Sequence, residues 1–289
     1  MKILITGHKG FIGQNFLKKL DSKKNTVYGL DIKDKSDCKK FFSSASYSFD
    51  LVIHCAAIIK GRETIDNNPL VIAENLAIDS SLFTWAIKAK PKQLVYFSSS
   101  AVYPVSLQTK ERKLKESDVV IKEKNSFDLP DKIYGWSKLT GELLANYYAD
   151  NYNGKVYIFR PFSGYGNGQD IDYPFPAFIR RAKKKENPFI IWGTGKQVRD
   201  FIHIEDILNA TFAAIKNNIT QPINLGTGIP TSFTSLAKMI TKKAGYLPKF
   251  SYLEEKPTGV SYRVADITRL KKFYTPKISL EEGIKKALS

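Results

Sequence analysis

Three closely spaced glycines near the start of the chain constrain its fold more than any other feature. Gly7, Gly10 and Gly13 follow the apolar run at residues 2–6, and helix-like periodicity then continues to Leu20. Where a strand leads through such a turn into a helix, a phosphate group can approach the bare backbone, and the first helical amides attract the anion. The stretch therefore predicts a turn that binds the pyrophosphate of a dinucleotide. The residues expected to contact it are Gly7, Gly10, Phe11, Ile12 and Gly13.

An acidic residue ends the second predicted strand, at residues 26–31. Asp31 is placed to accept hydrogen bonds from the ribose hydroxyls of an adenosine and to repel a 2′-phosphate. This favours NAD over NADP as the cofactor, although Lys33 lies close enough to weaken the repulsion. The alternative, a tight turn followed by a solvated acidic residue, is disfavoured by the order of the elements. We expect Asp31 and Ile32 to contact the cofactor.

Strand-like and helix-like segments alternate over the first 160 residues. Beyond the first two, the predicted strands are 51–55, 93–98 and 156–160, and the longer predicted helices are 70–90 and 133–151. This alternation is typical of a parallel sheet with helices on both faces. We expect an α/β fold with a doubly wound, Rossmann-like parallel sheet and a smaller mixed α/β lobe, the active site lying in the cleft between them.

The chain is expected to pass between these two parts more than once. Residues 1–160 would form the NAD-binding domain, to which a segment at about 196–227 returns, and residues 161–195 and 228–289 would form the substrate-binding lobe. Glycine, proline and aromatic residues dominate from 162 to 195, where the periodic pattern loosens. A last helix is predicted at 279–288.

A tyrosine and a lysine stand four residues apart on one predicted helix. Tyr134 and Lys138 should therefore share a face. An ammonium group beside a phenol favours the phenolate, which predicts that the pKa of Tyr134 moves from about 10 toward neutrality. Such a group takes a proton from a substrate hydroxyl while hydride leaves for a nicotinamide. Ser99, just past a predicted strand, would hold the same oxygen. Alone, this spacing is usually an ordinary packed pair, but the preceding glycine turn and serine indicate a catalytic triad.

The formal net charge of +17 calls for an anionic partner or a solvated surface. Nucleic acid, a membrane surface and phosphorylated small molecules are the classes of partner that a basic protein attracts. Basic runs such as residues 180–185 fall at predicted helix ends, where cations interact favourably with the helix dipole. The chain has no RNA-binding signature. We therefore interpret the charge as solvated surface around a nucleotide ligand, and do not expect nucleic acid as a partner.

The cysteines and the hydropathy indicate a cytoplasmic protein. Cys38 and Cys55 form no metal-ligand spacing and no disulfide framework, which fits a reducing compartment. The first apolar run is too short for a signal peptide, and no window is long enough for a spanning helix. His8, His54 and His203 have no second ligand at useful spacing, so no metal site is expected.

Motifs along nearly the whole chain resemble those of the extended short-chain dehydrogenase/reductases, specifically the NAD-dependent nucleotide-sugar epimerases and dehydratases. They are TGHKGFIG at 6–13, DLVIHCAA at 50–57, Asn75, SSSAVYP at 98–104, YGWSK at 134–138, RPFSGYG at 160–166, RDFIHIEDI at 199–207, NLGTG at 224–228 and KPTGVSYRVADITRL at 256–270.

The resemblance implies further site residues and an assembly. Lys138 would also bind the nicotinamide ribose, and Ser100 would join Ser99 and Tyr134 at the substrate. Arg199 and Arg263 would bind the sugar-nucleotide pyrophosphate, which suits the forked donors of guanidinium groups. The remaining residues implied at the cofactor are Ala56, Ala57, Asn75, Ser98 and Pro161. A homodimer is expected through the helices at 70–90 and 133–151. Its apolar faces would be Phe83, Trp85 and Ile87 or Leu143, Leu144 and Tyr147, which could equally pack on their own sheet.

The two residues after the catalytic serine limit which reactions of this family the chain could catalyse. In the 4,6-dehydratases of this family an Asp–Glu pair stands where this chain has Ser100 and Ala101, which cannot serve as an acid–base pair. The SSxxYP and KPTG…DITRL motifs are most similar to GDP-fucose synthases. Their double epimerisation uses a cysteine at the place of Ala101 and a later histidine, near whose position we find Tyr173.

Hydride transfer at C4 of a nucleotide sugar is the chemistry that these departures leave. We expect a 4-epimerase that works through a 4-keto intermediate, with a 4-dehydrogenase or a 4-keto reductase as the alternatives. A non-catalytic dinucleotide-binding regulator or RNA-binding protein of the same fold is a remote alternative, because Ser99, Tyr134 and Lys138 are all present.

Overall fold

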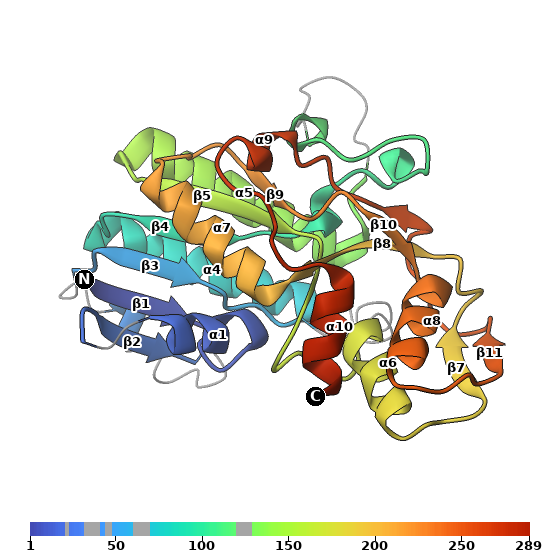
Figure 1. Cartoon of the computed structure of the whole chain (residues 1–289). Helices are drawn as coiled ribbons and strands as arrows, with labels where there is room; N and C mark the ends of the chain where they lie inside the picture. Colours follow the sequence, from blue (N-terminus) through green and yellow to red (C-terminus); the bar gives the residue numbers. More distant parts are fainter. Residues whose placement is uncertain (21–22, 32–40, 44–47, 60–69, 120–128) are drawn as a thin grey trace.

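A six-stranded parallel sheet forms the centre of the molecule. The computed structural model describes residues 1–20, 23–31, 41–43, 48–59, 70–119 and 129–289 (Figure 1). Side by side, the strands are β2 (Thr26–Leu30), β1 (Lys2–Thr6), β3 (Leu51–His54), β4 (Leu94–Phe97), β5 (Val156–Pro161) and β9 (Ile223–Leu225). The chain moves outward from β1 to β2 and then returns past β1 to β3. Ligands of such sheets bind beyond the carboxyl ends of the strands, at this reversal of strand order.

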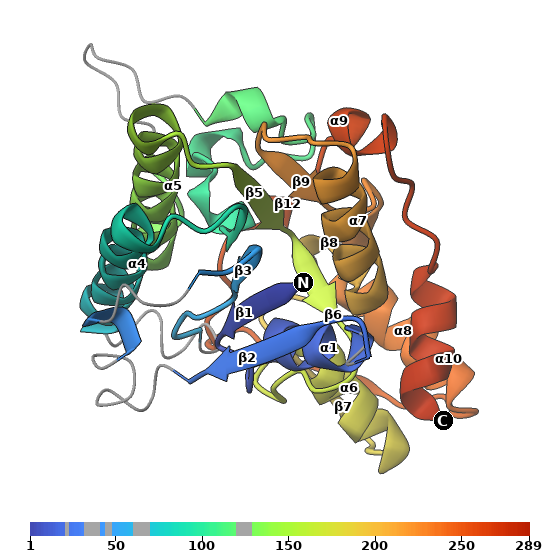
Figure 2. The ribbon, with the colours of Figure 1, turned by 90° about the vertical axis from the view of Figure 1, so that its left-hand side faces the viewer.

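Helices cover both faces of this sheet, as expected for a doubly wound α/β fold. Figure 2 shows α4 (Leu70–Ala89) and α5 (Lys132–Tyr152) on one side, with α1 (Phe11–Lys19) and α7 (Ile204–Lys216) on the other. Strands β3 and β4 are buried along their whole length because apolar side chains pack on both of their faces. Helix α1 packs against the core through Phe16, whose ring contacts that of Phe212 of α7 edge-on.

The predicted dimer faces divide into buried and exposed residues. Phe83 and Trp85 of α4 are buried in the core of their own subunit and cannot contribute to a surface. Ile87 and Leu144 are half-buried against the same core. Leu143 and Tyr147 of α5 are exposed, at 47% and 58% of their areas. Phe83 packs against Tyr148 of α5, whereas the ring of Trp85 packs against Phe41, Phe42 and Phe49.

Among the described residues, smaller sheets and four further helices follow β5, and three of these helices enclose a separate apolar core. The strands are β6 (Ser163–Tyr165), β7 (Phe189–Trp192), β8 (Val198–His203), β10 (Pro230–Ser232), β11 (Phe250–Leu253) and β12 (Tyr262–Arg263). The helices are α6 (Pro174–Lys183), α8 (Phe233–Lys243), α9 (Thr268–Lys271) and α10 (Leu280–Leu288), and all but α9 enclose that core. Three short 3-10 turns, η1 (Ser100–Val102), η2 (Val105–Leu107) and η3 (Glu116–Asp118), follow β4. The division into domains at residue 160 stays a prediction.

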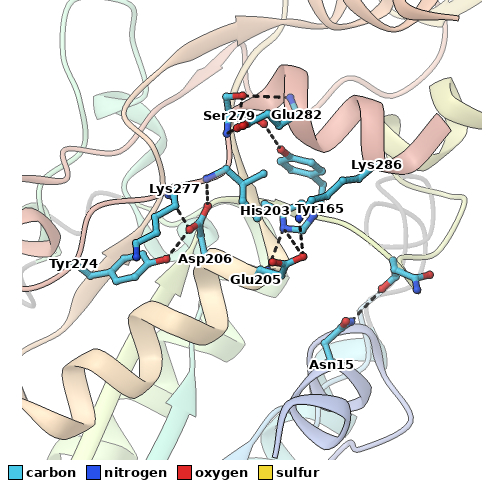
Figure 3. Close-up of polar contacts among 12 residues, drawn as sticks. Asn15, Tyr165, His203, Glu205, Asp206, Tyr274, Lys277, Ser279, Glu282 and Lys286 are labelled. Carbon is cyan, nitrogen blue, oxygen red and sulfur yellow. Dashed lines mark hydrogen bonds and ion pairs between the residues drawn. The ribbon is translucent and has the colours of Figure 1, made fainter. Parts of the chain in front are cut away.

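The C-terminal segment is tied to the start of α7, as Figure 3 shows. The buried carboxylate of Asp206 accepts hydrogen bonds from the hydroxyl of Tyr274 at 2.6 Å and from the amides of Lys277 and Ile278 at 2.8 and 3.0 Å. His203 caps α7, since its Nδ1 accepts a hydrogen bond from the amide of Glu205. These contacts fix β8, which carries one of the predicted substrate residues. No helix in the described ranges has the length and apolar character that crossing a membrane requires.

Candidate active site

The backbone of the glycine turn is packed so tightly that a side chain would not fit at Gly7 or Gly13. Gly7 has a φ of +68°, and a Cβ there would lie 2.7 Å from the Cα of Ala56, in the segment that follows β3. A Cβ on Gly13 would lie 2.7 Å from the Cα of His8 and overlap the carbonyl of Gly7. The amide of Gly10 donates to that carbonyl at 2.9 Å. Helix α1 begins at Phe11, directly after Gly10, so the turn lies at the N-terminus of the helix, where free amides attract an anion.

Asp31 lies beside this turn, one residue past β2. Its carboxylate is 3.1 Å from the ammonium group of Lys9, which belongs to the turn itself, and it is 19% exposed. The amide of Gly7 donates a hydrogen bond to the carbonyl of Leu30, which holds the glycine turn against the end of β2. The position is therefore compatible with a ribose contact. Ile32, also expected at the cofactor, lies outside the described residues.

The opposite wall of the cofactor site is formed after β3 and β4. Asn75 of α4 is buried, and its amide group binds the backbone of Ile58 at both ends, accepting from the amide at 2.8 Å and donating to the carbonyl at 3.2 Å. It thus holds the segment that contains Ala56 and Ala57. The hydroxyl of Ser98 donates to Glu142 in the interior. Pro161 ends β5.

The structure brings Ser99 and Tyr134 together at the carboxyl end of β4. The side chain of Ser99 caps η1, accepting from the amide of Ala101 at 3.1 Å, and it lies near enough to the phenol of Tyr134 to lower its pKa. Gly135 makes this approach possible, because a Cβ there would overlap the carbonyl of Ala101. The amide of Asp131 donates to the same carbonyl at 2.8 Å. Helix α5 therefore starts in direct contact with the loop that carries the serine.

The expected lowering of the pKa of Tyr134 by Lys138 is not what the structure shows. Burial raises the pKa of Tyr134, and the negative charge of Asp79 adds to this, while the nearby side chain of Ser99 opposes it. Lys138 is itself 2% exposed, and burial lowers the pKa of its ammonium group against the attraction of Asp79. The prediction treated both groups as exposed on a helix face. Desolvation in a closed interior is the largest influence on both groups, and neither is among the main influences on the other.

The two arginines predicted to bind a pyrophosphate lie on neighbouring strands. Arg199 on β8 and Arg263 on β12 are direct partners in a parallel pairing, so their side chains leave the same face of that sheet. A guanidinium nitrogen of Arg263 is 2.6 Å from Asp131, and its Nε donates to Gln108 at 2.7 Å. Arg263 thereby reaches the N-terminus of α5, three residues before Tyr134.

Several residues of this site were not found by sequence reasoning. Tyr173 was noted in the sequence only for its place near that of a histidine; it lies at the N-cap of α6, close enough to Tyr134 for that residue to raise its pKa. Asp131 and Gln108 hold Arg263, and neither stands in a recognisable motif. Asp79 follows Asn75 by four residues on α4 and was missed, although an acid on the apolar face of a predicted helix is a readable signal of a buried charge.

Together these residues can hold a dinucleotide and move a proton beside it. The glycine turn suits the pyrophosphate of the cofactor, and Asp31 suits its adenosine ribose. The observation that supports this fit is the lack of room for a Cβ at Gly7 and Gly13. The phenol of Tyr134 and hydroxyl of Ser99 can share one substrate oxygen. Paired arginines suit an anionic substrate group.

Comparison with known proteins agrees with this arrangement. The family model of the NAD dependent epimerase/dehydratase family matches residues 3–226. The chain is 30% identical to the UDP-glucuronate 4-epimerase of Thermodesulfobacterium geofontis, over 95% of this chain and 81% of that protein. It is 25% identical to the dTDP-4-dehydro-6-deoxy-D-allose reductase of a Streptomyces species, over 93% and 89% of the two chains.

A solved structure of the same kind aligns over the whole chain. The UDP-glucuronic acid 4-epimerase of Bacillus cereus, crystallised with UDP-glucuronic acid and NAD, superposes with a TM-score of 0.81 and 25% identity. The alignment covers 100% of this chain and 98% of that one. The match of the family model spans well over half of the sequence and includes the glycine turn, Ser99, Tyr134 and Lys138. The protein is therefore a member of the NAD dependent epimerase/dehydratase family.

Proposed function

We propose that the protein is a nucleotide-sugar 4-epimerase, which oxidises C4 of the sugar to a ketone and reduces it again with the opposite configuration. The observation that carries this proposal is the close packing of the start of α5, which bears Tyr134, against the loop that bears Ser99 at the carboxyl end of β4. The glycine turn follows β1 of the same sheet, and Ser99 is near enough to Tyr134 to lower its pKa. Relatives named for chemistry at C4 of nucleotide sugars support it. Ser100 and Ala101, which replace the acid–base pair of a dehydratase, argue against loss of water.

Each of the three predicted catalytic residues has a role in this reaction. The nicotinamide, when bound, supplies the acceptor and donor of hydride at C4. Tyr134 takes the proton of the 4-hydroxyl as the ketone forms and returns it after the ring has turned. Ser99 holds the same oxygen by hydrogen bond and orients it toward the phenol. Lys138 provides the positive charge that a phenolate at this position requires.

The nucleotide half of the substrate is assigned to the paired arginines. Arg199 and Arg263 would bind the pyrophosphate with charge-assisted hydrogen bonds, and their neighbouring register on β8 and β12 supports this role. Tyr173, which interacts with Tyr134, would line the sugar site. We further propose a homodimer that buries the exposed face of α5, where Trp136 is 38% exposed alongside Leu143 and Tyr147. We place the enzyme in the cytoplasm.

Deuterium at C4 of the sugar tests the reaction. Incubated with UDP-, GDP- and dTDP-hexoses labelled at this carbon, the protein is expected to return the label to C4 in the opposite configuration, because the hydride leaves and comes back on the same cofactor. The product is identified by NMR and mass spectrometry. A Tyr134→Phe sample is the control for non-enzymatic exchange.

Two other outcomes decide against a 4-epimerase. Label that appears in NADH, together with a 4-keto sugar, would identify a 4-dehydrogenase, whose reverse reaction is that of a 4-keto reductase. The Streptomyces reductase among the relatives makes this the second candidate. A 4-keto-6-deoxy product with label at C6 would show that water is eliminated, which contradicts the inference from Ser100 and Ala101.

The cofactor is proposed to be NAD. Because the carboxylate of Asp31 lies beside the glycine turn, it should repel a 2′-phosphate, and NAD should bind at least about tenfold more tightly than NADP, a difference of about 1.4 kcal/mol. Calorimetric titration with each dinucleotide measures the ratio. In Asp31→Asn the preference should fall. Asp50→Asn should leave it unchanged, because Asp50 precedes β3 at the opposite edge of the parallel sheet and is paired with Lys92. Equal affinities in the unaltered protein would refute the role of Asp31.

A further inference from the structure

Beneath the active site lies a buried polar cluster of which the proposed reaction uses only the lysine. It consists of Thr6 on β1, His54 on β3, Asp79 on α4, Tyr96 on β4 and Lys138 on α5, here named the Asp79 cluster. Each of these residues is exposed by 2% or less. Five elements of the Rossmann-like part therefore converge on one carboxylate in the interior. A buried charge of this kind is costly unless it is paired and fully hydrogen-bonded.

Hydrogen bonds satisfy both oxygens of the Asp79 carboxylate. The hydroxyl of Tyr96 donates to Oδ2 at 2.6 Å, and Nε2 of His54 lies 2.9 Å from Oδ1. The other ring nitrogen of His54 is 2.7 Å from the hydroxyl of Thr6. Burial lowers the pKa of His54, so the imidazole is neutral; it donates to Asp79 and accepts from Thr6. The two partners of Asp79 are thus uncharged, and its negative charge is not neutralised by them.

The cation that balances this charge is the ammonium group of Lys138. It lies 4.8 Å from the centre of the Tyr96 ring, whose hydroxyl is bound to Asp79. Burial lowers the pKa of Lys138, and the strongest opposing influence is the charge of Asp79; in turn, Lys138 is the strongest influence that lowers the pKa of Asp79. The titratable groups around Lys138, from every element packed on it, are His54, Cys55, Asp79, Tyr96, Tyr134 and Glu142.

The packing of α5 is built around this cluster. Gly141 stands three residues after Lys138 on the same helix. A Cβ at this position would lie 2.5 Å from Oδ2 of Asp79 and would overlap the hydroxyl of Tyr96. Only the absence of a side chain lets α5 come close enough to place its lysine above the Tyr96 ring. The position of Lys138 and the hydrogen bond of Asp79 therefore depend on one another.

We propose that Asp79 is a positioning residue of the active site, a fixed negative charge that keeps the ammonium group of Lys138 protonated and in place. The catalytic part of this inference rests on the proposed function, in which Lys138 supports the phenolate of Tyr134. Because Asp79 is 1% exposed, it is shielded from a substrate or cofactor, and it acts through Lys138 and through the effect of its charge on Tyr134. It also connects the lysine, through His54 and Thr6, to the strand that leads into the glycine turn.

Removing the charge should move two titrations in the same direction. Without Asp79, the protonated form of Lys138 loses its support, so the pKa of Lys138 falls. The same negative charge raises the pKa of Tyr134, so that pKa falls as well. Both limbs of a bell-shaped pH–rate profile would then shift toward lower pH. A purely structural role would lower the rate at every pH without moving the profile.

Asp79→Asn tests this, because it removes the charge and keeps the shape. The titration of Lys138 is followed in full-length protein by NMR of 13Cε-labelled lysine, with Lys138→Arg to assign the signal. We expect the midpoint to fall by about one pH unit or more, as for loss of a close opposite charge. The pH–rate profile should move in the same direction. Asp79→Thr is a second uncharged variant, in case the asparagine does not fold.

Asp206→Asn is the matched control, since Asp206 is an equally buried, fully hydrogen-bonded carboxylate at the start of α7. It should leave the midpoint of Lys138 unchanged. A folded, uncharged variant at position 79 with an unshifted midpoint would overturn the proposal. The NMR titration contains no sugar nucleotide, so this failure is distinguishable from failure of the proposed reaction. If the midpoint moves but no hydride transfer at C4 is found, the charge pairing stands and the reaction is wrong.

Discussion

Replacing Tyr134 with phenylalanine is expected to lower the turnover number for C4 inversion by about 10²–10⁴-fold, the usual contribution of one acid–base group. The change removes only the phenolic oxygen and leaves the ring beside Ser99. Affinity for NAD should therefore stay within about a factor of two, because Lys138, which we propose contacts the ribose, is retained. Initial rates with the sugar nucleotide identified by C4 labelling, and calorimetry with NAD, measure the two quantities.

Tyr147→Phe provides the matched control for this substitution. Tyr147 is on the same helix and is 58% exposed, so loss of its hydroxyl should leave turnover unchanged. If Tyr134→Phe keeps more than about a tenth of the activity, the proton is transferred by another group. Tyr173 would then be the first residue to test, because its phenol interacts with that of Tyr134.

Replacing Arg160 with methionine should destabilise the fold by about 3–5 kcal/mol, because it leaves a buried carboxylate without its cation. Arg160 on β5 donates two hydrogen bonds to Glu142 of α5, at 2.8 and 2.6 Å, and both side chains are less than 5% exposed. It also donates to the carbonyl of Glu116 and to the hydroxyl of Tyr103. Urea unfolding followed by circular dichroism gives the change in free energy.

Two further variants separate the buried pair from ion pairs in general. Changing Glu142 to leucine together with Arg160→Met removes both charges and should be more stable than Arg160→Met alone. Lys92→Met breaks a pair of 2.6 Å with Asp50 at the surface and should cost less than about 1 kcal/mol. A loss below this value for Arg160→Met would mean that Glu142 takes up a proton or water in the variant.

Five of the six strands of the central sheet could be predicted, most of them as apolar runs, whereas the three-residue strand β9 was not. The first predicted strand, residues 2–6, is identical with β1, and the predicted helix at 70–90 differs from α4 by one residue. Residues 162–195 carry no such period. There, β6, α6 and β7 alternate with glycine, proline and aromatic residues, and their pairing depends on β8 and β11, which follow later in the chain.

The candidate site was predictable where one helix or one turn defines it. The helical repeat places Tyr134 and Lys138 on one face, and the glycine spacing requires a close approach of backbone. The effect of burial on their pKa values could not be predicted, since it depends on Asp79 and on Tyr96, brought in from other elements. Nor does any local pattern pair Arg160 with Glu142, because a charged residue within a strand is ordinarily expected at the surface.

The order of the strands also limits how this enzyme can be re-engineered. Strand β9 completes the central sheet next to β5, yet more than sixty residues separate β5 from β9 in the chain, and α7, which covers that face, lies between them. A fragment cut after β5 would leave a hydrophobic sheet edge and a bare face open to other molecules. To change the sugar specificity, several separate segments must therefore be exchanged, while β8, α7 and β9 of this protein are retained. Chimeras joined at a single crossover should aggregate rather than exchange substrates.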